Sequence, residues 1–423
     1  MRASMSRGIY SVLMYLMVPL FVWRLFRRGF NARDYWQRWG ERFGYSDQPE
    51  LMDSIWVHAV SVGEVQAAVP LIEHFLQQDK AYPVVVTTTT PTGSSRVKRL
   101  FGDRVHHVYA PYDLPDAVNR FLNRINPSKV VVMETEIWPN MITWCFKRNV
   151  PLILANARLS ERSAKGYRRV PRLGKLATRR IRLIAAQSES DKQRLISIGA
   201  TEEQITVTGS IKMDVDLPAS LREQGAVLRR RLGIDRAIWV AASTHEGEEE
   251  QVLKACRQIR QQTPDSLLVL VPRHPERADT VEVLCKREGY GVMRRSADRG
   301  ADDVKDIYLV DTLGELTQFF AACDVAYIGG SLVPVGGHNM IEASALGVAV
   351  VFGPHLFNFQ EISTQLLEAD AARIIHDSDA LAGTVTELLA DANLRHQLGE
   401  NGKHFIEANR GALQRLIALI ESC

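Results

Sequence analysis

The feature that most constrains the fold of this 423-residue chain is a repeating order of apolar runs, polar turns and amphipathic segments from about residue 54 onwards. The apolar runs are nearly continuous rather than alternating, as in KVVVM (129–133), LLVLV (267–271) and VAVVF (348–352). Strands of this kind are buried on both faces, so the pattern predicts parallel β-sheets covered by helices on both sides. The length exceeds that of one ordinary core, and we therefore expect an α/β protein with two domains.

Seven candidate strands precede residue 213 and seven follow residue 235. We expect a membrane-associated helix with a basic flank at 1–30 and a Rossmann-like N-terminal domain at 31–212. A linker at 213–235 then leads to a second Rossmann-like domain at 236–423, whose last helix can pack back onto the first domain. No internal repeat or heptad pattern competes with this division.

Composition narrows the class of protein. A hydrophobic content of 46% and a charged content of 24% are those of a globular chain. The formal net charge of +3 is too small to indicate a nucleic-acid partner. The five cysteines are scattered without a CxxC pair, which argues against zinc and disulfides and indicates a reducing compartment.

The N-terminal segment 9–23, IYSVLMYLMVPLFVW, is apolar and uncharged, and it lies between arginines on either side. It lacks a signal-peptide cleavage site and is shorter than the roughly 20 residues of a typical spanning helix. An Arg-rich, aromatic segment follows, which suits an anionic membrane surface. We expect attachment to the cell inner membrane with the body on the cytoplasmic side. The sequence fits both a short span and a helix lying in one leaflet; a buried first helix with a solvated basic face is the alternative.

The stretch 326–342, AYIGGSLVPVGGHNMIE, is the strongest candidate for a ligand site. Its two glycine pairs let the backbone turn and approach a ligand closely. Asn339 is a good N-cap for a following helix, whose N-terminus would offer free N–H groups to a phosphate. Glu342 in the first turn could accept hydrogen bonds from ribose hydroxyls. The pattern favours a nucleotide site over a plain strand-to-helix turn with a capping acid.

Further polar residues follow other strands, where ligands of parallel sheets bind. Glu64 in SVGE stands at a helix start; it could act as a general base or merely complement the helix dipole. Glu134 and Glu136 lie two residues apart and should face the same way, towards an amine, a polyhydroxyl ligand or an arginine such as Arg158. Arg273 is a plausible clamp for a phosphate or carboxylate.

Metal and dinucleotide sites receive little support. His274 and His338 lie in different loops without ligand spacing, so hydrogen-bonding roles fit them better. The DVD at 214–216 lies in the expected linker rather than at a strand end, and we regard it as a chance match to the DxD of metal-dependent sugar transferases. No GxGxxG with a distal acid is present.

Taken in order, HAVSVGE, VTTTTPTGS, METEIWPN, NARLSERS, TGSIKMD, STHEGE, VPRHPER and GGHNMIEA closely resemble the Kdo transferase family. Its bacterial members move 3-deoxy-D-manno-octulosonic acid (Kdo) from CMP-Kdo to a lipid A precursor in lipopolysaccharide synthesis. The resemblance implies a GT-B fold with two Rossmann-like domains facing a cleft, Glu64 as general base and no cofactor. It implies CMP-Kdo contacts at Pro272, Arg273, Leu313, Gly314, Glu315, Asn339, Met340, Ile341 and Glu342. Candidate contacts to the acceptor or to Kdo are Ser61, Gly63, Glu134, Glu136, Arg158, Lys212, Ser243 and His245.

The resemblance also implies a mechanism. Glu64 would deprotonate the 6′-hydroxyl of lipid IVA, whose oxygen would attack the anomeric carbon of Kdo with inversion. CMP would leave as a monoester, stabilised by Arg273 and the helix N-terminus at Asn339. One phosphate needs no bridging divalent metal. The rival interpretations are a GT-B transferase using a nucleotide-diphosphate sugar and a non-catalytic, membrane-tethered nucleotide-binding protein.

Overall fold

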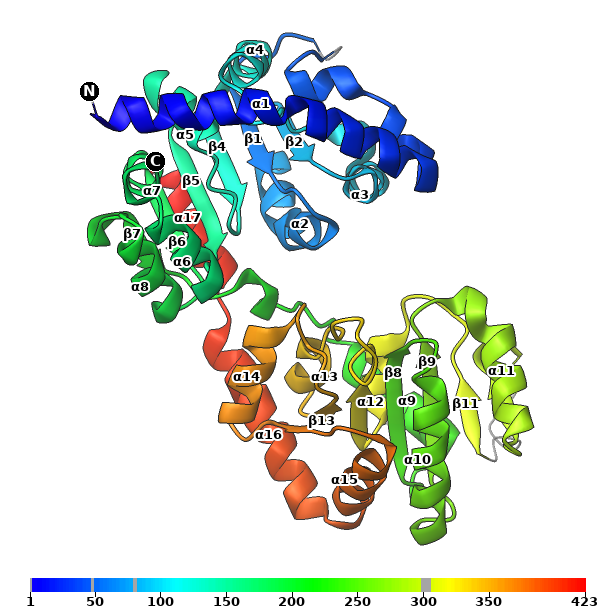
Figure 1. Cartoon of the computed structure of the whole chain (residues 1–423). Helices are drawn as coiled ribbons and strands as arrows, with labels where there is room; N and C mark the ends of the chain where they lie inside the picture. The colour runs from blue at the N-terminus through cyan, green and yellow to red at the C-terminus, as the bar shows by residue number, and fades with distance from the viewer. Residues whose placement is uncertain (1, 47–48, 79–81, 298–305) are drawn as a thin grey trace. The chain divides into compact units, whose positions relative to one another are not determined.

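The protein was analysed as a computed structural model that describes residues 2–46, 49–78, 82–297 and 306–423 (Figure 1). The chain forms two compact units: Met1–Asp214 with Gly411–Cys423, and Val215–Arg410. The C-terminal helix α17 (Ala412–Glu421) therefore belongs with the first unit. The chain passes between units at Asp214, and α9 (Leu221–Leu232), within the segment expected as a linker, is part of the second unit.

The first unit is built on a parallel sheet of seven strands in the order β3-β2-β1-β4-β5-β6-β7. The strands are β1 (Ser54–His58), β2 (Val84–Thr88), β3 (His106–Tyr109), β4 (Pro127–Met133), β5 (Leu152–Ala157), β6 (Leu183–Ala186) and β7 (Ile205–Val207). In register, Ile55 of β1 pairs with Val84 of β2, and Trp56 pairs with Val130 of β4. The strand order reverses at β1 and β4, and ligands of such sheets bind beyond the strand ends at this point.

Helices cover both faces of this sheet. They are α2 (Val62–Leu76), α3 (Pro91–Phe101), α4 (Pro115–Ile125), α5 (Pro139–Lys147), α6 (Glu161–Arg168), α7 (Pro171–Thr178), α8 (Glu189–Ser197) and α17. Proline opens α3, α4, α5 and α7, where its missing N–H costs nothing. Adjacent strand residues serve opposite cores: Trp56 packs with Phe121, whereas Val57 packs in the cluster that contains Leu416 of α17.

Shorter 3-10 turns connect these elements, and one long helix lies outside the two cores. The turns are η1 (Arg33–Trp36), η2 (Trp39–Phe43), η3 (Gly102–Arg104), η4 (Glu202–Gln204) and η5 (Ile211–Met213). The helix is α1 (Arg2–Asn31), which lies across the outer side of the first unit near α5 (Figure 1). It extends beyond the apolar segment 9–23 at both ends, because the basic flanks also continue the helix.

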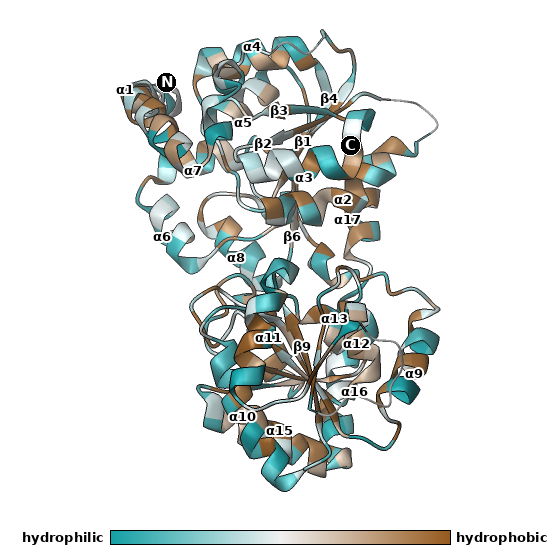
Figure 2. Ribbon diagram, turned by 90° about the vertical axis from the view of Figure 1, so that its right-hand side faces the viewer, coloured by the Kyte–Doolittle hydropathy of each residue, from teal (hydrophilic) through white to brown (hydrophobic). Residues whose placement is uncertain are grey.

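The second unit repeats the architecture, with a parallel seven-stranded sheet in the order β10-β11-β9-β8-β12-β13-β14. Its strands are β8 (Ile238–Thr244), β9 (Leu267–Pro272), β10 (Val292–Arg294), β11 (Ile307–Leu309), β12 (Val325–Ile328), β13 (Ala349–Phe352) and β14 (Ala372–Ile374). Here β8 and β12 meet where the strand order reverses, with Trp239 opposite Val325. Figure 2 shows hydrophobic strands at the centre of this unit and helices of mixed hydropathy around them.

The helices of the second unit are α9, α10 (Glu249–Gln262), α11 (Ala278–Arg287), α12 (Leu316–Ala322), α13 (Ile341–Ala345), α14 (Gln360–Glu368), α15 (Ser378–Ala390) and α16 (Ala392–Asn409), with turns η6 (Pro275–Arg277) and η7 (Arg295–Ala297). The prediction of an α/β fold with two parallel sheets is confirmed. One local expectation needs correction: α13 begins at Ile341 rather than directly after Asn339, and it is only five residues long.

Candidate active site

Glu64 is fixed at the start of α2, directly beyond β1. The Ser61 hydroxyl caps this helix by accepting a hydrogen bond from the Glu64 N–H at 3.2 Å, and it donates to Glu64 Oε1 at 2.9 Å. The Val60 N–H donates to Glu64 Oε2 at 2.9 Å. Each carboxylate oxygen thus has its own donor, so the carboxyl group holds one orientation. Only 7% of Glu64 is exposed.

The surroundings of Glu64 make it a strong base. Its pKa is raised to about 8, chiefly because burial disfavours the charged form. The hydrogen bond from Val60 lowers this pKa, whereas the carboxylates of Glu134 and Glu136 raise it. A carboxyl group with a pKa near the working pH can take a proton from a hydroxyl far more effectively than an ordinary surface glutamate.

Glu64, Glu134 and Glu136 form an acidic cluster at the ends of β1 and β4. Glu134 adopts a left-handed conformation with φ of 53°, and its carboxylate pairs with Lys212 Nζ at 3.1 Å. Glu136 Oε2 accepts a hydrogen bond from the Trp138 indole at 2.7 Å, and burial raises the pKa of Glu136. The structure therefore has Lys212 beside this cluster, where the sequence left an amine, a polyhydroxyl ligand or an arginine such as Arg158 open.

Asn156 fixes the loop that carries Lys212. It is fully buried at the end of β5, and its Oδ1 accepts a hydrogen bond from the Ile211 N–H at 3.1 Å. Its Nδ2 has no hydrogen-bond partner among the described residues. Arg158, two residues after Asn156, is half-buried and forms no ion pair with any described residue. The remaining candidates Ser61 and Gly63 lie on the turn into α2, where a side chain at Gly63 would meet only Ser61 Oγ at 3.9 Å.

In the second unit, the glycine loop after β12 is organised by a carboxylate that the sequence analysis did not single out. Glu248 is fully buried and accepts five hydrogen bonds. The donors are the N–H groups of His245, Gly330, Ser331 and Leu332 and the hydroxyl of Tyr327. The N–H groups in this part of the loop therefore already have an acceptor, the Glu248 carboxylate.

The free donors lie further along the loop. Gly336 N and Gly337 N both donate to Gly330 O, at 3.1 and 2.7 Å, which closes the loop on itself. Among the described residues, the N–H groups of His338, Asn339 and Met340 have no acceptor. Gly330, with φ of 66°, must be glycine, since a Cβ there would lie 2.9 Å from the His338 ring.

Asn339 and Glu342 form a hydrogen-bonded pair at the start of α13. Asn339 Nδ2 donates to Glu342 Oε1 at 2.9 Å, and Asn339 Oδ1 accepts from the Ile341 N–H at 3.1 Å. Burial raises the pKa of Glu342. The side chains of Met340 and Ile341 are buried in the unit, so only their backbone atoms can contact a ligand.

A group of basic side chains lies in the loops that follow β8, β9 and β12. His245 and His338 are stacked, and their Nε2 atoms are 2.7 Å apart, so they share one proton in a hydrogen bond. Burial lowers the pKa of His338 to about 4. The exposed Arg273 forms no side-chain hydrogen bond or ion pair within the described part of the chain. Ser243, at the end of β8, has φ of 58°, a strained value for a residue other than glycine.

The loop of Leu313, Gly314 and Glu315 joins β11 to α12. Leu313 is 80% exposed, whereas Glu315 pairs with Arg295 at 2.8 Å and accepts a hydrogen bond from the Thr312 hydroxyl. These bonds lower the pKa of Glu315. Pro272, another predicted donor contact, is buried as the last residue of β9.

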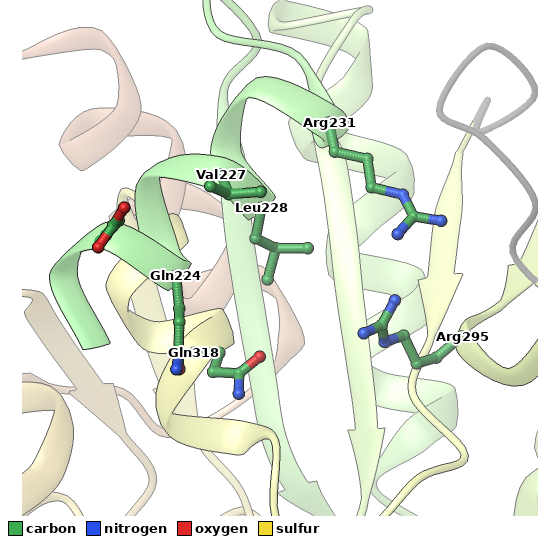
Figure 3. A pocket seen from close by; sticks show the side chains of 7 residues that line it. Gln224, Val227, Leu228, Arg231, Arg295 and Gln318 are labelled. Carbon is green, nitrogen blue, oxygen red and sulfur yellow. The ribbon is translucent and has the colours of Figure 1, made fainter. Parts of the chain in front are cut away.

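A cavity of about 350 Å³ lies beside this loop (Figure 3). It is lined by Glu223, Gln224, Val227, Leu228 and Arg231 of α9, by Gln318 of α12 and by Arg295. None of the predicted donor contacts lines it, but Arg295 links its wall to Glu315. Among the described residues, no group of three or more His, Cys, Asp or Glu side chains is arranged to hold a metal ion.

The structure thus gathers the predicted residues into two sets. Glu64, Glu134, Glu136 and Lys212 meet at strand ends of the first unit, and Arg273, His245 and Asn339–Glu342 follow strand ends of the second. The first set can accept a proton and bind a polar group; the second can bind an anion and hydroxyl groups.

Two parallel seven-stranded α/β units of this kind define the GT-B class of architecture. A UDP-GlcNAc 2-epimerase from Neisseria meningitidis has a similar fold, with a TM-score of 0.58 and 13% identity. The match covers 88% of this chain and 100% of that chain. At this identity the likeness concerns the fold alone.

Sequence comparison is more specific. Residues 37–215 match the family described as 3-deoxy-D-manno-octulosonic-acid transferase (kdotransferase). The 3-deoxy-D-manno-octulosonic acid transferase of Haemophilus influenzae is 41% identical over an alignment of 423 positions, which covers 99% of this chain and 98% of that protein. The Bordetella pertussis transferase of the same name is 35% identical over an alignment of 431 positions, which covers 99% of each chain. The chain belongs to the 3-deoxy-D-manno-octulosonic acid transferase family and is a glycosyltransferase.

Proposed function

We propose that this enzyme transfers Kdo from CMP-Kdo to the 6′-hydroxyl of lipid IVA, with inversion at the anomeric carbon and with Glu64 as general base. The observation that carries the proposal is the buried Glu64 carboxyl, held by Ser61 and Val60, with a pKa raised to about 8. Family membership supports Kdo as the transferred sugar. The product would be an intermediate of lipopolysaccharide biosynthesis.

The proposed step involves one proton and two bonds. Glu64 takes the proton of the acceptor hydroxyl as its oxygen forms a bond to the anomeric carbon of Kdo. The bond between that carbon and the CMP phosphate oxygen breaks, and CMP leaves with the bonding electron pair. The base is matched to its task because a pKa of about 8 lies close to neutral pH.

The second unit supplies the groups that would hold the donor. The unpaired guanidinium of Arg273 and the free N–H groups of residues 338–340 suit the CMP phosphate, which gains charge as it leaves. The Glu342 carboxyl, oriented by Asn339, suits ribose hydroxyls. Glu315, held by Arg295, is a further donor contact. The guanidinium of Arg273 together with the N–H groups of residues 338–340 can neutralise a single phosphate.

The first unit would hold the acceptor. Lys212 is paired with Glu134 but remains partly exposed, with 27% of its side chain accessible, so it can contact an acceptor phosphate or the Kdo carboxylate. Glu136 and Arg158 of this unit are further candidates for contacts to either sugar, as are Ser243 and His245 of the second unit. The lipid acceptor places the reaction at the cytoplasmic face of the inner membrane, and α1 would attach the enzyme there.

The test is a reaction of the purified full-length enzyme with lipid IVA and either CMP-Kdo or a nucleotide-diphosphate sugar. Mass spectrometry should show Kdo added to lipid IVA together with release of CMP, only with the first donor. Release of a nucleoside diphosphate from the second donor would instead support another GT-B transferase activity. Binding of CMP-Kdo without any product would support a non-catalytic nucleotide-binding protein.

A further inference from the structure

The helix α1 contacts the first unit along most of its length. Its less exposed residues recur every three or four positions, at Arg7, Tyr10, Ser11, Met14, Val18, Phe21, Val22, Leu25 and Gly29. This spacing defines one side of a helix. From Tyr10 to Leu25 the side extends about 22 Å at 1.5 Å per residue. The helix is therefore attached lengthwise, not at one end.

Polar contacts fix this side to the body of the unit. Tyr10 donates a hydrogen bond to the buried Asp113 at 3.0 Å, and Ser11 donates to Asn140 at 3.1 Å. One turn further on, the Tyr15 hydroxyl donates to Asp116. Near the other end, the Phe21 ring stacks on a tyrosine ring of the unit, with centroids 4.9 Å apart.

The opposite side of α1 is apolar and exposed. Its large side chains are Ile9, Val12, Leu13, Leu16, Met17, Leu20, Trp23, Phe26 and Phe30, with Leu16 70% exposed. The window of highest hydropathy between Ser6 and Phe30 is only 6% buried, although its length and composition alone would also allow a membrane span. Figure 2 shows α1 at the edge of the first unit with hydrophobic residues along it.

Basic and aromatic residues mark the C-terminal end of this face. Arg24, Arg27 and Arg28 are exposed and form no ion pair with any described residue. The Arg27 guanidinium lies 5.5 Å from the centre of the Trp23 ring. Arginine next to tryptophan is typical of the boundary between lipid headgroups and acyl chains, and the positive charge complements anionic lipids.

We infer that α1 is a monotopic helix that lies in the plane of the membrane, with its apolar side in one leaflet and its other side on the enzyme. A helix crossing the bilayer in this attachment would carry Asp113, Asp116 and the Asp116–Arg120 ion pair into the hydrocarbon, where charged groups are strongly disfavoured. The inference rests on the membrane attachment and cytoplasmic body proposed above, but not on the transfer reaction.

The topology predicts that both ends of α1 remain on the cytoplasmic side. A cysteine at Gly8 tests this, because Gly8 is exposed and a Cβ there meets nothing within 4 Å. We would compare Gly8→Cys in a Cys423→Ser background with the native chain, whose exposed Cys423 is the matched control. A membrane-impermeant maleimide should label both in inside-out vesicles and neither in intact spheroplasts.

The in-plane position of α1 and the cytoplasmic location of the body would be contradicted by different labelling results. Labelling of Gly8→Cys in spheroplasts, with Cys423 protected, would establish a spanning helix and overturn the in-plane assignment while leaving the cytoplasmic body intact. Labelling of Cys423 in spheroplasts would overturn the proposed localisation itself. A Gly8→Cys enzyme that transfers Kdo but is labelled from outside would overturn the in-plane helix and leave the proposed transfer reaction intact.

Depth measurements give a second, quantitative test. Spin labels at Leu13→Cys, Leu16→Cys and Leu20→Cys, in the Cys423→Ser chain, would be read by oxygen accessibility in phosphatidylethanolamine–phosphatidylglycerol vesicles. An in-plane helix places all three at similar depths, about 5–10 Å below the headgroups. A spanning helix makes Leu13 and Leu20 differ by about 10 Å in depth, which would overturn the inference. Spin–spin broadening between labels on different chains, with no exposure of the labels to lipid, would also overturn the in-plane helix. A second copy of the chain would then cover this face of α1.

Discussion

The loss of stability on replacing the buried Glu248 can be predicted from the number of hydrogen bonds that its carboxylate accepts. Oε1 accepts from the Tyr327 hydroxyl and from Ser331 and Leu332, whereas Oε2 accepts from His245 and Gly330. Glu248→Gln keeps the shape but replaces one oxygen by an NH₂ group. The less costly orientation places the NH₂ group at the position of Oε2, where two buried donors then lose their acceptor.

Each buried donor left without an acceptor costs about 1–3 kcal/mol, so the free energy of unfolding should fall by about 4 kcal/mol. For a unit of this size, each kcal/mol moves the melting temperature by roughly 2–4 °C. Calorimetry of the full-length protein should therefore show the melting transition of the second unit lowered by about 8–16 °C.

The control is Glu250→Gln, which makes the same chemical change at an exposed position of α10. A surface substitution of this kind should change the free energy of unfolding by less than about 0.5 kcal/mol. A Glu248→Gln protein that melts within 2 °C (about one kcal/mol or less) of this control would refute the account of how the glycine loop is held.

Two further predictions concern activity, and a third concerns the binding of CMP. Because Glu64 acts deprotonated and its pKa is raised to about 8, kcat/KM should rise with pH up to about 8 and then level, as a pH–rate profile would show; a profile flat between pH 6 and 9 would contradict this. Glu134→Gln removes a carboxylate that raises the pKa of Glu64, so the same profile should shift to lower pH, and an unmoved or higher midpoint would count against the acidic cluster. Arg273→Ala should weaken CMP binding by about 1.5–3 kcal/mol, roughly 10- to 150-fold by calorimetric titration, with unchanged melting because its side chain is exposed and unpaired; an unchanged affinity would remove Arg273 from the donor site.

The fold could be predicted because it depends on local composition. Strands buried on both faces must be nearly continuous in apolar residues, and segments such as 129–133 and 267–271 became β4 and β9. The location of candidate residues followed from the same pattern, since polar groups after parallel strands gather at one edge of each sheet. Glu64 was found in this way, together with its position in the first turn of α2.

The partners of these residues could not be predicted, because they come from distant parts of the chain. Glu248 and Gly330 are 82 positions apart, Lys212 and Glu134 are 78 apart, and Tyr10 and Asp113 are 103 apart. No periodic pattern in one sequence links such residues. Arg158 was a reasonable partner for the acidic cluster by charge alone, but the loop held by Asn156 brings Lys212 there instead.

The role of Glu64 as a base is the centre of this account, and the most direct measurement is the rate of Kdo transfer by Glu64→Gln. The amide still accepts a hydrogen bond at the helix start, so folding, melting temperature and CMP-Kdo binding should stay close to those of the native enzyme. The transfer rate should fall by about 10²–10⁴-fold, the usual contribution of a general base. A variant that binds CMP-Kdo and transfers Kdo at a near-native rate would show that Glu64 only caps α2.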